Sequence, residues 1–356
     1  FGSRSLKALT ELVPLPYVSG PLLASVVRVM TSALTSHFQD GKQRLPAVPA
    51  QQRLSASVYA VLGMNPGAYA LTGTNTYLVG TGDKRILIDT GEGRPEYIPN
   101  LERAMALAGA VGLQEIVVTH WHFDHLGGVP SVQERFGHVP VRKFMPEVQE
   151  ETFGGEGAVD PYSVWPKHKF RPLRDGEVIR TEGATLQVLH TPGHANDHVV
   201  LVHEEDKAMF TGDNVLGVGT SVFRNLGHYM ASLERMSDVA VCRGIKTLYP
   251  AHGPVVVGAS AKLKEYIGHR QQRIDQVLGV VRTAPATGFT CEEVTRKLYA
   301  GIPEDLIHAA AGNTMLVLLK LQGDGKVLRA SAATSRQPGD ALSHWSARWV
   351  PRHSRI

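Results

Sequence analysis

The feature that most constrains this chain is a run of metal-binding side chains directly after a buried strand. The apolar, β-branched run Glu115-Ile-Val-Val-Thr119 predicts the strand, and the six residues that follow contain His120, His122, Asp124 and His125. Imidazole and carboxylate groups suit zinc and other transition metals, and four of them in so tight a loop cannot all reach one tetrahedral ion. The sequence therefore predicts a site for two metals at the end of a strand.

Each metal needs further ligands, and the chain offers three at loop positions that follow strands. They are His194 in His190-Thr-Pro-Gly-His194, Asp213 in Thr211-Gly-Asp213, and His252 in Pro250-Ala-His-Gly253. Each lies beside glycine, where the backbone can approach a metal closely. A single histidine at a strand end is more often structural than a ligand, but the whole set is better explained by metal binding.

Hydrophobic periodicity predicts strands alternating with helices. We expect strands at 58–62, 75–79, 85–88, 115–119, 177–180, 185–189, 199–202, 208–211 and 246–249. We expect helices at about 98–107, 229–241, 262–281 and 304–321, and a further one opened by the capping box Thr290-Cys-Glu-Glu293. Between Met145 and Arg174 the pattern breaks into glycines, prolines and aromatics, which is typical of a long insertion loop. The fold class is therefore α/β, with sheets covered by helices.

These elements divide the chain into four parts. Residues 1–56 are an N-terminal extension, 57–257 the main domain, 258–330 a helical domain, and 331–356 a basic tail. In 258–330 the expected order is three helices and then a short strand at 326–328, which resembles a winged-helix unit.

Composition excludes several classes of protein. With 43% hydrophobic and 20% charged residues, disorder throughout the chain is excluded. No stretch approaches the roughly 20 apolar residues that a membrane-spanning helix requires, so we expect no membrane span. Cys242 and Cys291 stand far apart without a Cys-x-x-Cys pattern, which indicates neither a disulfide framework nor a thiolate metal site.

Positive charge is concentrated at the two ends of the chain. The whole chain carries +4, residues 1–56 carry +4 and residues 331–356 carry +3, which leaves −3 for residues 57–330. Nonspecific binding to nucleic acid depends on clustered cations, so only the ends are suited to it. The first 56 residues are poor in acids and do not begin with Met, as expected for an imported precursor that has lost its presequence.

The candidate ligands resemble the five motifs of the metallo-beta-lactamase superfamily, which appear here in order: Asp89, His120 to His125, His194, Asp213 and His252. The resemblance implies an αβ/βα sandwich that holds two Zn²⁺ at one edge. It implies that the first ion is bound by His120, His122 and His194. It implies that the second is bound by Asp124, His125 and His252, and that Asp213 bridges both together with a hydroxide.

The same resemblance implies hydrolysis, with Asp124 and Asp213 as the catalytic carboxylates. Two ions about 3.5–4 Å apart acidify a water and clamp the oxygen that gains charge. Asp89 would orient the histidine loop without binding metal. His198, on the strand after the His194 loop, is expected to support the ligands from behind.

Flanking motifs across 57–330 resemble one branch of the superfamily more than others. The set is Gly73-Thr-Asn-Thr-Tyr-Leu-Val-Gly80, Thr119-His-Trp-His122, Thr191-Pro-Gly-His194 with Asp197-His198, Gly219-Thr-Ser-Val-Phe223, and His269-Arg270. That branch, beta-lactamase-like protein 2, consists of single-strand-specific endoribonucleases of animal mitochondria. Fungal acyl-carrier-protein thioesterases of polyketide pathways share much of the signature, and glyoxalase II shares the metal motifs.

Three functions stay open at this stage. A single-strand-specific endoribonuclease is the first expectation and an acyl thioesterase the second. The chain departs from the nuclease pattern at Phe123, where a basic residue is usual, and at Ala195, where threonine is usual. The third is an accessory subunit of a larger organellar complex.

The expected partners and location follow from these functions. The substrate would be single-stranded RNA or an acyl thioester, and protein partners would bind through residues 1–56 and 331–356, where Trp345 and Trp349 stand among arginines. The amino terminus favours the mitochondrial matrix, with a plastid or cytoplasmic location as alternatives.

Overall fold

The computed structural model describes residues 45–67, 70–147, 161–301, 303–330 and 346–352. One compact unit ends at Arg270, and a second begins at Gln271. Most of the N-terminal extension, and Trp345 of the basic tail, lie outside the described residues. Of the helices in the described ranges, none combines the length and the apolar character needed to cross a membrane.

The first unit contains a sheet whose strands are ordered as in the sequence. They are β1 (Gln51–Arg53), β2 (Val58–Leu62), β3 (Asn75–Val79), β4 (Lys84–Ile88), β5 (Gly112–Val118), β6 (Val141–Phe144) and β7 (Arg171–Leu173). Pairing is antiparallel from β1 to β4 and parallel from β4 to β7. Parallel neighbours need crossover connections, which helices supply here.

A second sheet of the same unit has a mostly antiparallel pattern. Its strands are β8 (Val178–Thr181), β9 (Ala184–His190), β10 (Val199–His203), β11 (Ala208–Gly212), β12 (Thr247–Pro250) and β13 (Val256–Val257). β11 and β12 pair in parallel, and the other neighbours are antiparallel. The long helix between β11 and β12 makes that parallel pairing possible.

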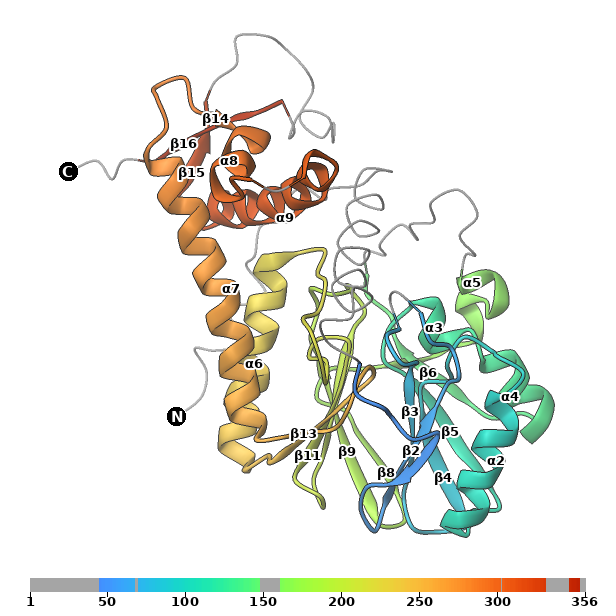
Figure 1. Ribbon diagram of the computed structural model, residues 1–356. Coiled ribbons are helices and arrows are strands. Elements are labelled where there is room, and N and C mark those ends of the chain that lie inside the picture. Colours follow the sequence, from blue (N-terminus) through green and yellow to red (C-terminus); the bar gives the residue numbers. More distant parts are fainter. Residues whose placement is uncertain (1–44, 68–69, 148–160, 302, 331–345, 353–356) are drawn as a thin grey trace. The chain divides into compact units, whose positions relative to one another are not determined.

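Helices cover the outer faces of the two sheets (Figure 1). α2 (Tyr97–Ala108) and α4 (Val129–Phe136) lie on the first sheet, and α6 (Leu226–Arg243) lies on the second. Shorter helices are α3 (Phe123–Leu126), α5 (Pro161–Val164) and the 3-10 turn η2 (Lys167–Lys169). α7 (Ala259–Arg282) begins in this unit. The first unit is therefore a four-layered αβ/βα sandwich.

Two apolar clusters hold these layers together. One lies between the sheets and contains Val79 and Ile86 of the first sheet with Leu201 and Phe210 of the second. The other lies between the first sheet and its helices. Each fully buried side chain of this kind contributes about 1.5–3 kcal/mol, so the clusters fix the strand ends from which the loops emerge.

The second unit is a helical domain with a small sheet. It contains the last part of α7, α8 (Cys291–Leu298) and α9 (Glu304–Gly323), with β14 (Phe289–Thr290), β15 (Val327–Arg329) and β16 (Arg348–Pro351) in the order β14-β16-β15. The predicted capping box is confirmed, because Thr290 accepts from the Glu293 N–H and Glu293 accepts from the Thr290 N–H. The expected order of helices and strand is found in this unit.

Three segments that were predicted without a strand each contribute one. The extension contributes the edge strand β1, and the expected insertion loop contains β7, which pairs with β6. The tail contributes β16, the middle strand of the small sheet, and its Trp349 is fully buried. Trp349 is therefore a core residue and not a surface for partners. All three strands are short and lack an apolar alternation, so periodicity could not reveal them.

Candidate metal centre

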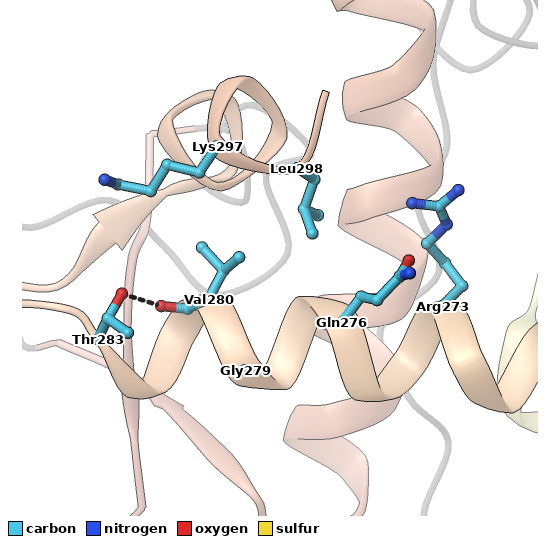
Figure 2. Close-up of a pocket in the computed structure, with 7 residues that line it drawn as sticks. All are labelled: Arg273, Gln276, Gly279, Val280, Thr283, Lys297 and Leu298. Carbon is cyan, nitrogen blue, oxygen red and sulfur yellow. Dashed lines mark hydrogen bonds between the residues drawn. The ribbon is translucent and has the colours of Figure 1, made fainter. Parts of the chain in front are cut away.

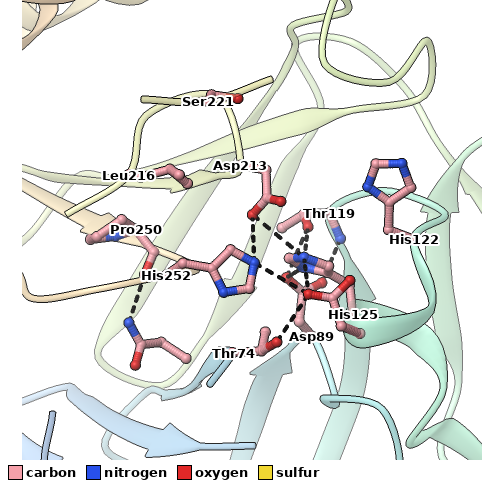
Figure 3. A network of polar contacts seen from close by, with 12 residues as sticks. Thr74, Asp89, Thr119, His122, His125, Asp213, Leu216, Ser221, Pro250 and His252 are labelled. Atoms are coloured by element: carbon pink, nitrogen blue, oxygen red, sulfur yellow. Dashed lines mark hydrogen bonds and ion pairs between the residues drawn. The ribbon is translucent and has the colours of Figure 1, made fainter. Parts of the chain in front are cut away.

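The candidate ligands come together at the ends of strands from both sheets of the first unit. β5 leads into the segment with His120 to His125, β9 leads to His194, β11 to Asp213 and β12 to His252. His120 and His122 stand two residues apart in the turn that leads from β5 into α3, and their ring nitrogens face each other. Trp121 between them points into the apolar cluster under α2 and α4 and is 6% exposed. Figure 3 shows part of the resulting network.

The first group of candidate ligands consists of three histidines and one carboxylate. Nε2 of His120 lies 2.8 Å from Nδ1 of His122 and 3.3 Å from Nε2 of His194. The His122 and His194 nitrogens lie 3.0 Å apart. Oδ2 of Asp213 lies 3.9 Å from the His120 nitrogen and 3.5 Å from the His194 nitrogen. Four ligand atoms thus converge on one point, as tetrahedral zinc requires.

The second group consists of Asp124, His125 and His252. Oδ2 of Asp124 lies 3.4 Å from Nε2 of His125 and 3.2 Å from Nε2 of His252. The other oxygen of Asp213, Oδ1, lies 3.4 Å and 3.2 Å from the same two nitrogens. Asp213 therefore turns one oxygen toward each group, which is the placement expected of a shared ligand. Figure 3 shows its contacts with His125 and His252.

Two observations indicate that these residues can bind a pair of zinc ions. One is the chemistry of the donor atoms, and the other is that some of these buried atoms have no hydrogen-bond partner among the described residues. Nε2 of His125 and Oδ1 of Asp213 are buried and lie 3.4 Å apart as an ion pair, but neither has a hydrogen-bond partner among the described residues. Buried polar atoms are normally paired, so such atoms aimed at one point indicate a missing partner. Histidine nitrogens with carboxylate oxygens are a donor set that zinc accepts.

Asp89 holds His125 from behind, as its position in the sequence suggested. Its Oδ2 accepts from Nδ1 of His125 at 2.8 Å and from the Thr119 hydroxyl at 2.8 Å. Its Oδ1 accepts from the Thr119 N–H. Asp89 adopts a left-handed backbone with φ of 57°, which aspartate tolerates better than most residues. Both carboxylate oxygens are thus committed, and His125 keeps Nε2 for the centre.

His194 is oriented by a backbone carbonyl. Its Nδ1–H donates to the Val222 oxygen at 2.8 Å, which leaves Nε2 for the first group. The preceding Gly193 has φ of 132°, and a Cβ there would lie 2.4 Å from the backbone N of Tyr229. Only glycine therefore fits at this close contact between the His194 loop and α6.

His198 lies behind Asp213 and does not join either group. Its Nε2 accepts from the backbone N–H of Asp213 at 3.1 Å, so its Nδ1–H donates to the Thr191 hydroxyl at 3.1 Å. A ring nitrogen that accepts a backbone N–H has no lone pair left for a metal. His198 thus fixes the backbone of Asp213 from a buried position.

Sequence reasoning missed a set of polar residues that support the second group. The Thr74 hydroxyl donates to Oδ2 of Asp124 at 3.2 Å, and the buried Asn65 side chain exchanges hydrogen bonds with Thr74. Asn75 donates to the Pro250 and Gly253 carbonyls on either side of His252. Thr74 and Asn75 belong to the segment 73–80 that was noted only as a family resemblance, so their polar side chains at the start of β3 were the available signal.

Burial lowers the pKa of all three histidines in the first group. Removal from water disfavours the charged imidazolium, and neighbouring histidines lower the pKa of His120 and His122 further. These three rings are therefore neutral near pH 7, which is the protonation state that binds metal.

The second group has the opposite charge state. Burial again lowers the pKa of its histidines, but Asp213 and Asp124 outweigh it, raising the pKa of His252 to about 10 and that of His125 well above its usual value. Burial raises the pKa of the Asp124 and Asp213 carboxyls. The neighbouring His125 and His252 outweigh this effect and hold both pKa values well below the usual range. Without metal, this group is a buried set of ion pairs.

Two cations contact the segments that carry the candidate ligands, and both are engaged in packing or pairing. The Arg224 guanidinium lies 4.8 Å from the centre of the Trp121 ring. Lys143 is fully buried and forms an ion pair with Asp197, in the loop that carries His194. The side chain that follows His122 is the half-buried Phe123.

The second unit carries a shallow groove of its own (Figure 2). It is lined by α7 and the turn after it, from Arg273 to Thr283, and by Lys297 and Leu298 of α8. Its lining includes no His, Asp, Glu or Cys, so it offers neither metal ligands nor a general base.

The sequence matches a known family over most of its length. The family model of the metallo-beta-lactamase superfamily matches residues 70–325. An atrochrysone carboxyl ACP thioesterase from Aspergillus chevalieri is 41% identical over 297 residues, covering 82% of this chain and 89% of that protein. The beta-lactamase-like protein 2 homolog of Drosophila melanogaster is 40% identical over 301 residues, covering 83% of this chain and 99% of that protein.

Solved structures agree on the fold. The crystal structure of a metallo-beta-lactamase family protein from Thermus thermophilus matches with a TM-score of 0.61 at 24% identity, covering 84% of this chain and 100% of that chain. At this level of identity the likeness concerns the fold alone. The family and the fold class expected from the sequence are thereby confirmed.

Proposed function

Because this chain belongs to the metallo-beta-lactamase superfamily and gathers two groups of candidate ligands around Asp213, we propose that it is a dinuclear zinc hydrolase of acyl thioesters. The observation that carries the metal assignment is the placement of the two Asp213 oxygens, one toward each group. The thioester assignment is supported by the name of the relative from Aspergillus chevalieri.

The residues present can divide the work of hydrolysis among them. Two zinc ions bound here would lower the pKa of a water molecule and withdraw electron density from the scissile carbonyl. His120, His122 and His194 are neutral donors, so they bind without neutralising the first ion. Asp124 and Asp213 supply negative charge to the second ion, and Asp124 is the more exposed of the two, at 21% against 12%. We assign Asp124 the proton that the attacking water loses, because its side chain is the more accessible and Thr74 engages only its Oδ2.

The charge of the sequence supports a thioester over RNA. A strand of RNA carries one negative charge per nucleotide and is bound along a track of Lys and Arg. Here Phe123 follows His122, at the position where the nuclease branch that the flanking motifs resemble carries a basic residue. Residues 147–160 add five acidic side chains and no basic one to the chain after β6. The stretch from 57 to 330 as a whole carries −3.

Single-strand-specific cleavage of RNA is the second candidate. It is favoured by the fly relative, which this chain matches over 99% of its length, and by the flanking motifs shared with that branch. The same two ions would then polarise a phosphate in place of a carbonyl. If the protein is this nuclease, we propose that it acts in the mitochondrion.

One assay separates the two candidates. Zinc-loaded protein is given acyl thioesters of N-acetylcysteamine and, in parallel, a labelled single-stranded RNA. The proposal expects zinc-dependent thioester hydrolysis that is lost in an Asp124→Ala, His125→Ala double variant. RNA cleavage without thioester hydrolysis would replace the proposal with the nuclease, and silence on both would favour an accessory role in a larger complex.

A further inference from the structure

One loop of the first unit, residues 214–223, touches both groups of candidate ligands. Its Val222 carbonyl accepts Nδ1–H of His194 at 2.8 Å. Its Gly217 N–H donates to the backbone oxygen of His252 at 2.8 Å. A Cβ at Gly217 would lie 2.1 Å from the Pro254 oxygen, so the loop packs tightly against the His252 segment. The position of this loop therefore affects both groups.

Two side chains of α7 hold the loop from outside. The Tyr266 hydroxyl accepts from the Leu216 N–H at 3.0 Å and donates to the Gly219 oxygen at 3.1 Å. Nη2 of Arg270 donates to the Ser221 oxygen at 2.7 Å. The two residues stand four apart, so they share one face of the helix. Tyr266 fixes the first part of the loop, and Arg270 fixes the part next to Val222.

Arg270 is bound on two sides. Its guanidinium lies 4.8 Å from the centre of the Phe223 ring and 5.8 Å from that of Tyr229. Phe223 and Tyr229 are themselves stacked, with ring centres 5.3 Å apart. Nε of Arg270 is buried without a hydrogen-bond partner among the described residues. The bond to Ser221 is thus the directional contact by which Arg270 sets the backbone at 221–222.

We propose that Arg270 is a positioning residue for His194. By holding the Ser221 carbonyl it fixes the peptide that precedes Val222, and the Val222 carbonyl in turn fixes the rotation of the His194 ring. Nε2 of His194 then faces the nitrogens of His120 and His122. The inference rests on the metal assignment of the proposed function. It concerns the first group, because Arg270 holds the part of the loop next to Val222, whereas the contact with the His252 segment is made at Gly217.

The test is a zinc competition titration against a chromophoric chelator, which resolves two dissociation constants. Arg270→Met removes the donor and keeps the apolar stem, and Arg270→Lys keeps a charged donor. Arg273→Met is the matched control, since Arg273 lies on the same helix but stacks over the Tyr299 ring of the second unit. His194→Ala and His252→Ala show which constant belongs to which group.

We expect Arg270→Met to weaken the constant of the His194 group about tenfold, the lower end of what loss of an outer hydrogen bond costs a metal site. The other constant and the Arg273→Met protein should match wild type, and Arg270→Lys should fall between. If Arg270→Met does not fold, Arg270→Gln, which loses the length and the charge of the guanidinium, takes its place, and a wild-type constant for the His194 group in that variant would overturn the inference.

Two other results would overturn it as well. Equal weakening of both constants together with a loss of unfolding free energy would make Arg270 a general support of the fold. If both zinc dissociation constants of Arg270→Met equal those of wild type, the hydrogen bond from Arg270 to Ser221 is not needed to position His194. If the wild-type protein binds no zinc at all, the metal assignment itself fails, and the inference fails with it.

Discussion

The two groups of candidate ligands share Asp213 but are built in opposite ways. In the first group, His194 donates to a backbone carbonyl, and all three rings are neutral because burial lowers their pKa. In the second, His125 donates to the carboxylate of Asp89, and the pKa of His252 is raised to about 10. One group is ready for a cation, and the other already contains positive charge.

The difference shows how one edge of the sandwich can hold two metal sites of different charge. Neutral histidines leave the charge of an ion in place, whereas carboxylates neutralise part of it. The second group must lose protons before it binds metal, and the first does not. Asp213 is shared by the two groups and couples them. Each substitution below is therefore expected to change the metal affinity of one group or of both.

The largest effect is expected from the change that breaks both groups at once. Asp213→Asn removes the charge that faces the first group through Oδ2 and the second through Oδ1. We expect zinc content to fall below two ions per chain and thioester hydrolysis to fall on the order of 10²–10³-fold, since the ions supply several kcal/mol of transition-state stabilisation.

Metal analysis and kcat/KM measure this effect. Asp175→Asn is the control, because the Asp175 side chain is 45% exposed and pairs at the surface with Arg235. Full zinc content with nearly normal turnover in Asp213→Asn would show that this carboxylate is not shared.

The next effect separates the groups. His194→Ala should remove the first ion and leave the second, and His252→Ala should do the reverse, because each histidine contributes to one group. We expect each variant to keep about one zinc per chain and to lose activity about 10²-fold. Metal content after dialysis tests this. Loss of both ions in either variant would mean that the groups do not bind independently.

A smaller effect is expected when only the support of one group is weakened. Asp89→Asn keeps a side chain that tolerates the left-handed backbone but loses the charge that holds Nδ1–H of His125. We expect affinity for the second ion to fall about 10–100-fold, with the first ion unaffected. Competition titration is the measurement, and an equal loss at both ions would place Asp89 in the general fold.

The smallest effect is a difference in proton release. Because the pKa of His252 is about 10, the metal-free protein holds this proton at pH 7 and must release it on binding the second ion. The sign follows: affinity for the second ion should rise with pH up to about 10, and that for the first ion should change little above pH 7.

Calorimetry in two buffers of different ionisation enthalpy counts the protons. About one proton or more should accompany the second ion at pH 7, and none the first. Equal proton release at both ions would contradict the charge difference between the groups.

Much of the main domain could be predicted from the sequence because its strands carry strong apolar patterns. The run at 75–79 and the buried run at 115–119 correspond to β3 and to the end of β5. β1 and β16 could not be predicted, since three exposed or half-buried residues such as Gln51–Arg53 have no periodicity to detect. What makes them strands is the partner strand, a contact that local sequence does not encode.

The candidate ligands were predictable, and their supports were not. Histidines and aspartates after strands carry a chemical signal in the sequence alone, and the structure brings all seven together. Thr74 and Arg270 lie in segments that resemble one branch of the family, but their residue types alone do not indicate a role at a metal site, because a threonine or an arginine is common on any surface. Their roles are visible only in the structure, where the Thr74 hydroxyl lies 3.2 Å from Oδ2 of Asp124 and Nη2 of Arg270 lies 2.7 Å from the Ser221 oxygen.

Diffraction from crystals of the zinc-loaded protein at the zinc absorption edge tests the central claim most directly. The account predicts two anomalous peaks about 3.5–4 Å apart, one beside His120, His122 and His194 and one beside Asp124, His125 and His252, with Asp213 in contact with both. A single peak, or a second peak distant from Asp213, would contradict it.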